Sequence, residues 1–383
     1  MDDDELRELV PKVLSVLVRR GADFSTAEDA VQEALIRALS TWEDDAPSDP
    51  EGWLITVSWR VFIDFARSDA ARRNREVRFD AEPPTSVVPS TDDTLHLYFL
   101  CAHPDLTPSS AVALTLRAVG GLTTGQIAQA YVVPESTMAQ RISRAKRTVG
   151  RAGVDRLGAL PTVMRVLYLV FNEGYSGDVD LAAEAIRLAR QLATLVSDPE
   201  VDGLLALMLL HQARRCSRTR PDGGIVPLAE QDRSQWDAEL IAEGVDIVQA
   251  ALAQDQLGEY QAQAAIAALH ADAPRFEDTD WVQILEWYDE LLRFADSPFI
   301  RLNRVVAVGE ADGPLAGLAA LADIAENVPR RDAVAAYLHE RNGDLALAAR
   351  LYASAARNAP NLAEREYQTR QAARLNQRVR DQR

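Results

Sequence analysis

The residues best suited to chemistry lie in one stretch, GGLTTGQIAQAYVVPESTMAQRISRAKRTV, which covers residues 120–149. Between Glu135 and Arg151 the sequence has one acid against five cations, namely Arg141, Arg144, Lys146, Arg147 and Arg151. Cationic side chains gathered on one side of a helix hold DNA phosphates and read base edges. The stretch therefore predicts a contact with nucleic acid.

Two helices must position these cations. Thr123 is suited to cap a first helix from Thr124 to about Ala130, and Pro134 to begin a second helix that runs from Glu135 past Arg147. We expect the residues that pack the two helices together to be Ile127, Ala128, Val132, Met138 and Ile142. The side chains then left to contact bases or phosphates are Glu135, Ser136, Thr137, Gln140, Arg141, Arg144, Lys146 and Arg147. The alternative for the cations is a solvated helix face.

The overall charge of the chain is opposite to that of this stretch. The chain has 383 residues and a formal net charge of −17, so the surplus acid must lie elsewhere. Local charge, rather than the total, decides what a phosphate backbone meets. At about 150 residues per domain, the length predicts two or three domains.

Composition also bears on location and redox state. No apolar run approaches the ~20 residues that span a bilayer, and the start, MDDDELREL, is acidic where a signal peptide is basic. We expect a cytoplasmic protein that does not contact a membrane. Cys101 and Cys216 belong to no C-x-x-C pair, so we expect both to be reduced and buried.

Helical periodicity continues along the chain without a strand pattern, which predicts an all-α fold. A Pro-, Ser- and Asp-rich piece at 79–93 is typical of a linker, here an acidic one, between a first domain at 1–78 and a second at 94–152. From 158 to 383 the pattern is one of helices joined by short Gly and Pro turns. Such a pattern indicates stacked antiparallel pairs.

The last helices of this part resemble a tetratricopeptide repeat. Small residues such as Ala336 and Ala348 would let two helices approach closely, Gly343 permits a tight turn, and Pro360 stops the second helix. An Ala-rich helical hairpin of no particular family is the alternative.

The stretch ALTLRAVGGLTTGQIAQAYVVPESTMAQRISRAKR resembles region 4 of the extracytoplasmic-function (ECF) sigma factors of the sigma-70 family. Region 4 reads the upstream (−35) promoter element. Two earlier stretches, STAEDAVQEALIRAL and PEGWLITVSWRVFIDFARSDAARR, resemble region 2 of the same factors. The resemblance implies a bacterial alternative sigma factor, with a region 2 helical bundle and a region 4 helix-turn-helix. Its partners would be promoter DNA and core RNA polymerase, at the β′ coiled coil and the β flap.

The resemblance also implies roles for residues of region 2. The first helices of region 2 bind the polymerase coiled coil, which implies that role for Asp29, Gln32 and Glu33. A later helix captures the melted downstream (−10) element, where rings stack on bases and cations follow phosphates. The residues implied there are Trp59, Arg60, Asp64 and Arg67. The family commonly has an Arg-Asn pair where Trp59 and Arg60 stand, so base-level roles at these two positions stay open. On helical spacing, we expect Phe62 and Phe65 in the core.

Three further stretches resemble the ECF subgroup that has a tetratricopeptide-like extension: HLYFLCAHPDL, LVFNEGYSGD and LAEQDRSQWDAELIAEG. The extension is expected to regulate or support the factor, and to hold a peptide or protein partner. Ser234 and Asp237 have the spacing of a capping box. Arg233 and Trp236 would then be free for an interface, with core packing as the alternative.

Metal binding and catalysis have weaker support in the sequence. His96, Cys101 and His103 supply at most three zinc ligands, so we expect packing there and no metal site. Among Glu173, Asp178 and Asp180, an Asp is better explained as the cap of the following helix than as a catalytic carboxylate. We therefore predict no catalytic residue, no cofactor and no enzyme.

Two other functions stay open at this point. A helix-turn-helix regulator that acts without polymerase would need no region 2. An enzyme housed in the extension would have a pocket with perturbed carboxylates around Glu173.

Overall fold

The computed structural model of the chain describes residues 3–42, 47–73, 94–152, 157–173, 175–176, 179–220 and 223–382. Most of these residues are helical, and the only strands among them form a small antiparallel hairpin, β1 (Tyr175–Ser176) and β2 (Val179–Asp180). The predicted all-α fold is confirmed, whereas the small hairpin was not predicted. The predicted linker at 79–93 lies outside the described residues.

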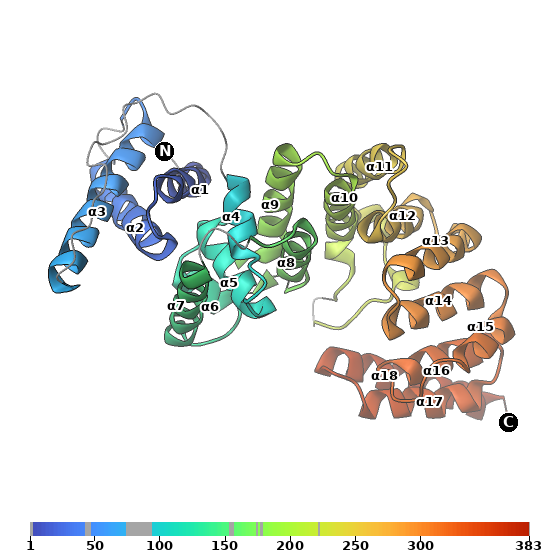
Figure 1. Cartoon of the computed structure of the whole chain (residues 1–383). Helices are drawn as coiled ribbons and strands as arrows, with labels where there is room; N and C mark the ends of the chain where they lie inside the picture. Colours follow the sequence, from blue (N-terminus) through green and yellow to red (C-terminus); the bar gives the residue numbers. More distant parts are fainter. Residues whose placement is uncertain are drawn as a thin grey trace. The chain divides into compact units, whose positions relative to one another are not determined.

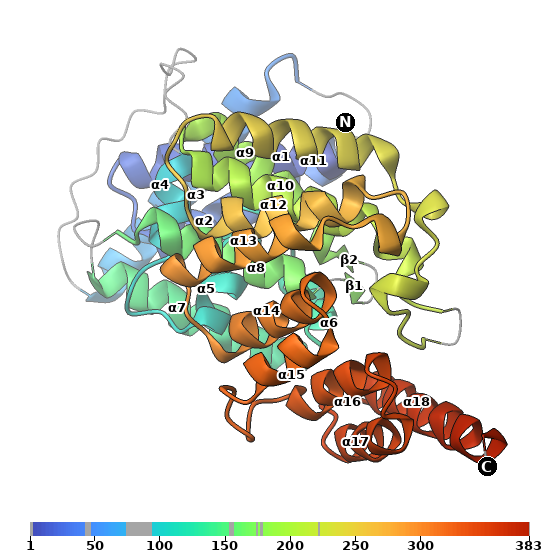
Figure 2. The same cartoon turned by 90° about the vertical axis from the view of Figure 1, so that its right-hand side faces the viewer.

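The chain divides into two compact units, one from Met1 to Val196 and the other from Ser197 to Arg383. Figures 1 and 2 show the elements of each unit in order along the chain. No helix in the described part of the chain is both long enough and apolar enough to cross a membrane.

The first unit begins with three packed helices, α1 (Asp3–Arg19), α2 (Phe24–Thr41) and α3 (Pro50–Arg73). Asp23 caps α2 by accepting a hydrogen bond from the backbone N–H of Thr26. The buried stripe of α2 is made mostly of alanines, which let α1 and α3 approach it closely: Ala27, Ala30, Ala34 and Ala38. Trp42, just after α2, meets Trp53 of α3 edge to face at 5.0 Å between ring centroids.

Four shorter helices follow, α4 (Thr94–Cys101), α5 (Pro108–Ala118), α6 (Thr124–Ala130) and α7 (Glu135–Ala152). Helix α5 is the centre of this group, because it packs on α4, α6 and α7 and its residues Leu114 and Leu116 are fully buried. Cys101 is buried as predicted, and burial raises the pKa of its thiol.

The first unit also contains the next two helices, α8 (Leu160–Glu173) and α9 (Leu181–Leu195). Asp180 caps α9, accepting hydrogen bonds from the N–H groups of Ala182 and Ala183, which confirms the capping prediction. Helix α8 packs on α4 and α5, and the N–H of Gly158 donates to the carbonyl oxygen of Phe99 in α4 at 2.9 Å. The predicted division of the chain at 158 thus falls inside a compact unit, and as a domain boundary it stays a prediction.

The second unit is organised around α10 (Pro199–Ala213), which is buried nearly all round. Two neighbours cover α10, namely α11 (Ala238–Leu252) and α12 (Glu259–Asp272). Glu200 at the start of α10 accepts hydrogen bonds from the N–H groups of Tyr260 and Gln261, both at 3.0 Å. It supplies the N-terminal cap that Gly258 lacks. Three single-turn 3₁₀ helices lie between α10 and α11: η1 (Arg215–Ser217), η2 (Leu228–Glu230) and η3 (Arg233–Gln235).

The remaining helices pack mainly on their neighbours in sequence, after the single turn η4 (Phe276–Asp278). They are α13 (Trp281–Phe294), α14 (Pro298–Ala311), α15 (Pro314–Leu321), α16 (Arg331–Arg341), α17 (Leu345–Arg357) and α18 (Leu362–Asp381). Between α16 and α17, Gly343 has φ of 90°, which confirms the predicted glycine turn. This nearest-neighbour packing is what helical repeats require. The specific tetratricopeptide assignment stays a prediction.

Candidate nucleic-acid interface

The predicted helix-turn-helix is present as α6 and α7. Thr123 Oγ1 accepts from the N–H of Gln126 at 3.1 Å, and Gln126 Oε1 accepts from the N–H of Thr123 at 2.8 Å. This reciprocal capping box fixes the start of α6. The predicted packing of Val132 is wrong, because its side chain is 84% exposed at a φ of 50°, where it makes the turn rather than the core.

One side of α7 is apolar and buried, formed by Met138, Ile142, Ala145 and Val149. Most residues predicted to contact DNA lie on the other side. The exposed ones are Glu135, Ser136, Thr137, Gln140, Arg144 and Arg147, and Arg141 is half-buried. The helix therefore presents a polar, basic surface of the kind that enters a DNA groove.

Lys146 differs from the other predicted DNA contacts. It is buried, and its ammonium group forms ion pairs with Glu28 and Asp29 of α2, the latter at 3.1 Å. In this structure the acids of α2 occupy the ammonium group of Lys146, so its predicted contact with DNA stays a prediction.

Helix α3 presents three of the four residues predicted for the downstream element. Arg60, Asp64 and Arg67 are exposed and follow each other at four and three residues, which places them on one helix face. Trp59 is a correction, because its side chain is 2% exposed. Its ring packs against Phe62 at 5.3 Å between centroids, beneath the Arg20 guanidinium.

The two phenylalanines of α3 have different environments. Phe62 is buried, as predicted. Phe65 is 40% exposed, so its assignment to the core is wrong. Phe65 is thus an exposed aromatic ring next to the row of charged residues on α3.

On α2, the residues predicted to bind polymerase reach solvent to different degrees. Asp29 is exposed, whereas Gln32 and Glu33 are half-buried, and Glu33 forms an ion pair with Arg37 at 3.1 Å. The same helix exposes two large apolar side chains, Ile36 at 63% and Leu39 at 53%. The sequence analysis did not single out this pair. Polar residues are expected at both positions on a solvated helix face, so the apolar residues there were a signal that could have been found.

Arg233 and Trp236, the predicted interface of the extension, instead join three segments within the second unit. The Trp236 side chain is buried and donates from Nε1 to Ser217 Oγ at 2.8 Å. The Arg233 guanidinium stacks over this ring at 4.6 Å and donates to the carbonyl oxygens of His270 and Ala273 at the end of α12. Trp236 is therefore a packing residue, which agrees with the core packing weighed against an interface from the sequence.

The predicted capping box near this ring is also absent. Asp237 itself caps α11, and Asp232, not Ser234, begins the preceding turn. Cys216, in the same loop, is exposed, so the expectation that it is buried is wrong.

Burial changes the titration of several groups around this loop. It lowers the pKa of His211 to about 3 and that of His270 to about 4. Burial also lowers the pKa of Arg214 to about 10, and the neighbouring guanidinium groups of Arg218 and Arg233 add to that effect. Both histidines are consequently neutral near pH 7.

For the carboxylates near Glu173 the sequence favoured a helix cap over catalysis, and for His96, Cys101 and His103 it favoured packing over a metal site. Glu173 is exposed, Asp180 is occupied as a helix cap, and Asp178 lies outside the described residues. Among the residues that the structure describes, no group of three His, Cys, Asp or Glu side chains is placed to hold a metal ion.

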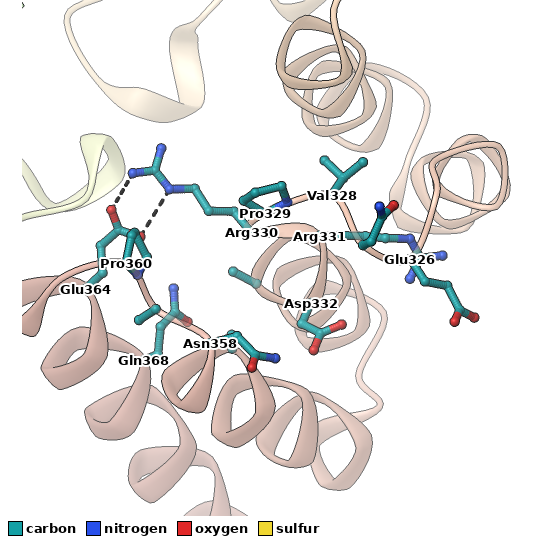
Figure 3. Close-up of a pocket in the computed structure, with 14 residues that line it drawn as sticks. Glu326, Val328, Pro329, Arg330, Arg331, Asp332, Asn358, Pro360, Glu364 and Gln368 are labelled. Atoms are coloured by element: carbon teal, nitrogen blue, oxygen red, sulfur yellow. Dashed lines mark hydrogen bonds and ion pairs between the residues drawn. The ribbon is translucent and has the colours of Figure 1, made fainter.

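The extension also has a cavity of about 310 Å³ beside α16, α17 and α18. Figure 3 shows Arg330 reaching Glu364 across its edge, where the two side chains form an ion pair. Arg330 has φ of 67°, and its backbone precedes α16 without a side-chain cap. The walls carry both charge signs, with Glu326, Asp332 and Glu364 opposing Arg330 and Arg331.

Comparison with known families gives three matches along the chain. Residues 6–73 match sigma-70 region 2, and residues 96–149 match sigma-70 region 4. Residues 159–252 match a family of unknown function, DUF6596. The first match covers most of α1 and all of α2 and α3, the second covers most of α4 to α7, and the third begins just before α8.

Similar proteins agree with these matches. An uncharacterized protein of Rhizobium meliloti is 40% identical over 352 residues, which cover 83% of this chain and 82% of that protein. A probable ECF RNA polymerase sigma factor, SigI of Mycobacterium tuberculosis, is 31% identical over 45% of this chain. The ECF RNA polymerase sigma factor SigJ of the same species is 31% identical over 39% of it. The matches span 63% of SigI and 50% of SigJ.

No solved structure matches the chain. The paired sigma-70 regions, in their order along the chain and on the helices described above, decide the assignment. The chain belongs to the ECF sigma factors of the sigma-70 family, the alternative sigma factors of transcription initiation.

Proposed function

We propose that this sigma factor binds core RNA polymerase through α2, reads the upstream promoter element with α7 and holds the melted downstream element on α3. The observation that carries the proposal is the surface of α7. Six predicted contact residues are exposed there, on the side of α7 opposite its buried apolar stripe. The preceding helix α6, whose start is fixed by a capping box, packs on α7. A helix supported in this way is suited to insertion into the major groove.

The role proposed for α3 is revised from the sequence prediction. With Trp59 buried, Phe65 is the ring that is available to stack on an unpaired base, and Arg60 and Arg67 are the cations available to phosphates. Stacking and charge together are how proteins hold single strands.

The polymerase contact proposed for α2 combines charge with apolar area. Asp29, Gln32 and Ile36 follow helical spacing, so an acidic group and an exposed apolar side chain share one surface. Such a surface fits a basic helical partner such as the β′ coiled coil. The β flap is proposed as a partner of the α4–α7 region by family resemblance alone.

For the extension, we propose a regulatory or supporting role in the cytoplasm, where the factor meets polymerase. Its nearest-neighbour helix packing and the mixed-charge cavity at α16 support contact with a peptide or protein. The sigma family is not a class of enzymes, and we assign no catalytic step to the extension.

Binding to core polymerase tests the α2 assignment directly. The Ile36→Glu substitution should weaken the binding of fluorescently labelled full-length protein to core polymerase by tenfold or more, roughly 1.4 kcal/mol. Val282→Glu is the matched control, because Val282 is 60% exposed on α13 of the extension and should not affect affinity. Equal affinities for the two variants would refute the proposed surface.

A further inference from the structure

Three arginines gather near the Trp236 ring in the second unit. The guanidinium carbons of Arg214 and Arg233 lie 5.9 and 4.6 Å from the centroid of the ring. Arg218 follows η1 directly, is exposed, and lies within electrostatic reach of Arg214. The stretch RRCSRTR at 214–220 has four arginines and no acid. Positive charge is therefore concentrated at one place in a chain whose net charge is −17.

Two neighbouring arginines, by contrast, are neutralised by carboxylates. Arg220 forms an ion pair with Glu230 at 3.5 Å. Arg275 donates from Nε and Nη2 to the two carboxylate oxygens of Asp278, at 2.8 and 2.9 Å. Within the described part of the chain, the three arginines near Trp236 form no ion pair. They are thus cations for which the described residues supply no counter-ion.

Hydrogen bonding around the ring is incomplete as well. Nε of Arg214, Nη2 of Arg233 and Nδ1 of His270 are buried without a hydrogen-bond partner. Arg233 uses its other terminal nitrogen, which donates to the backbone carbonyl oxygens of His270 and Ala273. A buried donor without an acceptor is costly, and more so when it is charged. The two guanidinium groups therefore lack an acceptor that none of the described residues provides.

The charges of the cluster also act on one another. Burial, together with the guanidinium groups of Arg218 and Arg233, lowers the pKa of Arg214 to about 10. The carboxylates of Glu277 and Asp278 oppose the effect of burial on the pKa of Arg233, whereas no carboxylate does so for Arg214. Contact with the aromatic ring offsets part of the cost of burying a cation, but leaves its charge in place. An anion would offset both the charge and the missing acceptors.

The loop that carries these arginines is held against the ring. Trp236 Nε1 donates to Ser217 Oγ at 2.8 Å, and Ser217 Oγ donates to the carbonyl oxygen of Arg214 at 3.0 Å. Ser217 is buried and lies directly before Arg218. The backbone between the two arginines is therefore fixed, as a site that binds a small ligand requires.

We infer that this cluster binds a phosphate group, held by Arg214 and Arg218 with Arg233 beside them on the Trp236 ring. Guanidinium groups bind phosphate oxygens through paired N–H donors. A phosphate dianion also balances several cations better than the single charge of a carboxylate does. Because Arg218 is exposed, the site is open to solvent. The ligand is free phosphate or a small phosphorylated metabolite, and the site lies wholly within the second unit, so it does not depend on the function proposed above.

Isothermal titration calorimetry of the full-length protein with inorganic phosphate tests the site, with chloride at equal ionic strength as the reference. Arg218→Gln should weaken phosphate binding by about tenfold or more, because it removes an exposed cation of the site. Arg220→Gln is the matched control. It removes the same charge from the same loop, but from a side chain already paired with Glu230, and should leave the affinity unchanged.

Cys216, between the two arginines of the loop, reports where the phosphate binds. It is exposed, whereas Cys101 is buried, so iodoacetamide alkylates Cys216 selectively in the folded protein. Saturating phosphate should slow this alkylation in the unsubstituted protein and in Arg220→Gln. The protection should be lost in Arg218→Gln. Phosphate binding without any protection of Cys216 would place the ligand elsewhere and overturn the inference.

Arg214→Met gives a second test that does not depend on Arg218. Phosphate should raise the melting temperature of the unsubstituted protein, because a ligand that binds the folded state stabilises it. The variant lacks a guanidinium of the site, so its melting temperature should rise less. An equal rise in both proteins would contradict the role of Arg214.

Two phosphate esters, glycerol phosphate and adenosine monophosphate, distinguish the sources of the phosphate group. Tighter binding of either ester than of inorganic phosphate, lost in Arg218→Gln, assigns the site to a phosphorylated metabolite. Tighter binding of inorganic phosphate assigns it to the free ion. Absence of binding by all three ligands, or equal affinities of Arg218→Gln and Arg220→Gln, would overturn the phosphate site.

Discussion

The hydroxyl group of Tyr98 in α4 donates a hydrogen bond to the carbonyl oxygen of Leu188 in α9, with 2.9 Å between the two oxygens. The same hydroxyl lies 3.2 Å from Gln191 Oε1. The Tyr98 side chain is 1% exposed, so the bond lies inside the first unit. Region 4 therefore shares a core with the first helices of the extension, and any division of the chain for experiment must respect that core.

The first prediction concerns where the chain tolerates truncation. A protein that ends at residue 153 loses α8 and α9, which exposes the apolar side of α4 and α5. We expect it to aggregate or to unfold without a cooperative transition, whereas a protein that ends at Val196 should unfold cooperatively. Circular dichroism melts of the two proteins make the comparison. Tyr98→Phe in the full chain should cost about 1 kcal/mol. A stable, cooperative protein ending at 153 would contradict the shared core.

The second prediction concerns the DNA contact of α7. Arg144 is exposed on the polar side of the helix and lies outside the ion pairs with region 2. If it contacts a phosphate, Arg144→Ala should weaken the binding of polymerase holoenzyme to promoter DNA for every sequence, and reduce the salt dependence by about 0.9 in log–log slope. If it reads a base, the loss should fall on one promoter position. Binding isotherms at several salt concentrations distinguish the two, and no change in either would remove Arg144 from the interface.

The third prediction concerns the close approach of α14 and α15. A Cβ added to Gly317 would lie 2.8 Å from the Cα of Gly309, which is backbone and cannot rotate away. Gly317→Ala should therefore destabilise the second unit by about 1–3 kcal/mol. Gly150→Ala is the control, because nothing lies within 4 Å of its added Cβ and the helix should gain up to about 1 kcal/mol. Thermal unfolding of both variants measures the difference, and an unchanged Gly317→Ala protein would show that the helices separate freely.

The fourth prediction concerns pH. His211 and His270 have pKa values of about 3 and 4 in the folded protein, below the usual value near 6.5, because burial disfavours their charged forms. Between pH 6.5 and about 4, His211 and His270 bind more protons in the unfolded chain than in the folded protein. The free energy of unfolding therefore falls as the pH is lowered through this range. The second unit should lose about 1.4 kcal/mol per pH unit for each histidine well inside that window.

Hydrogen exchange of α10 and α12 between pH 7 and pH 5, corrected for intrinsic exchange rates, measures this loss. The acids whose pKa is lowered in this unit, such as Asp232 and Asp278, ordinarily titrate below that range. Burial raises the pKa of Asp202 on α10, so Asp202 offsets part of the loss as the pH falls. His270→Gln should remove its share of the pH dependence. Equal protection at pH 7 and pH 5 would contradict the prediction.

The features predicted correctly from the sequence are those that neighbouring residues decide. Thr123, the turn before Pro134 and the glycine at 343 specify caps and turns through bonds within a few residues. The wrong predictions depended on tertiary contacts. Trp59 and Phe65 both lie on α3, and only the packing of α1 and α2 decides which of them is buried.

The ion pairs of Lys146 are a still longer-range feature. Its partner Glu28 is 118 residues away in the sequence. Neither residue has a local pattern that announces the pair, since a buried cation on a basic helix looks like any other cation in the sequence. The family could be predicted from the sequence, because its motifs lie in continuous stretches. The contact between regions 2 and 4 could not be predicted, because it depends on how these stretches pack in three dimensions.

Run-off transcription with purified core polymerase over a promoter library tests the central claim most directly. The full-length factor should direct initiation at a defined set of promoters, and a protein ending at Val196, which keeps α1 to α9, reports how the part of the extension after Val196 changes the yield. Promoter-specific transcripts that depend on the added factor are the predicted result. If neither protein binds core polymerase or yields a specific transcript, the assignment of these surfaces to transcription initiation is contradicted.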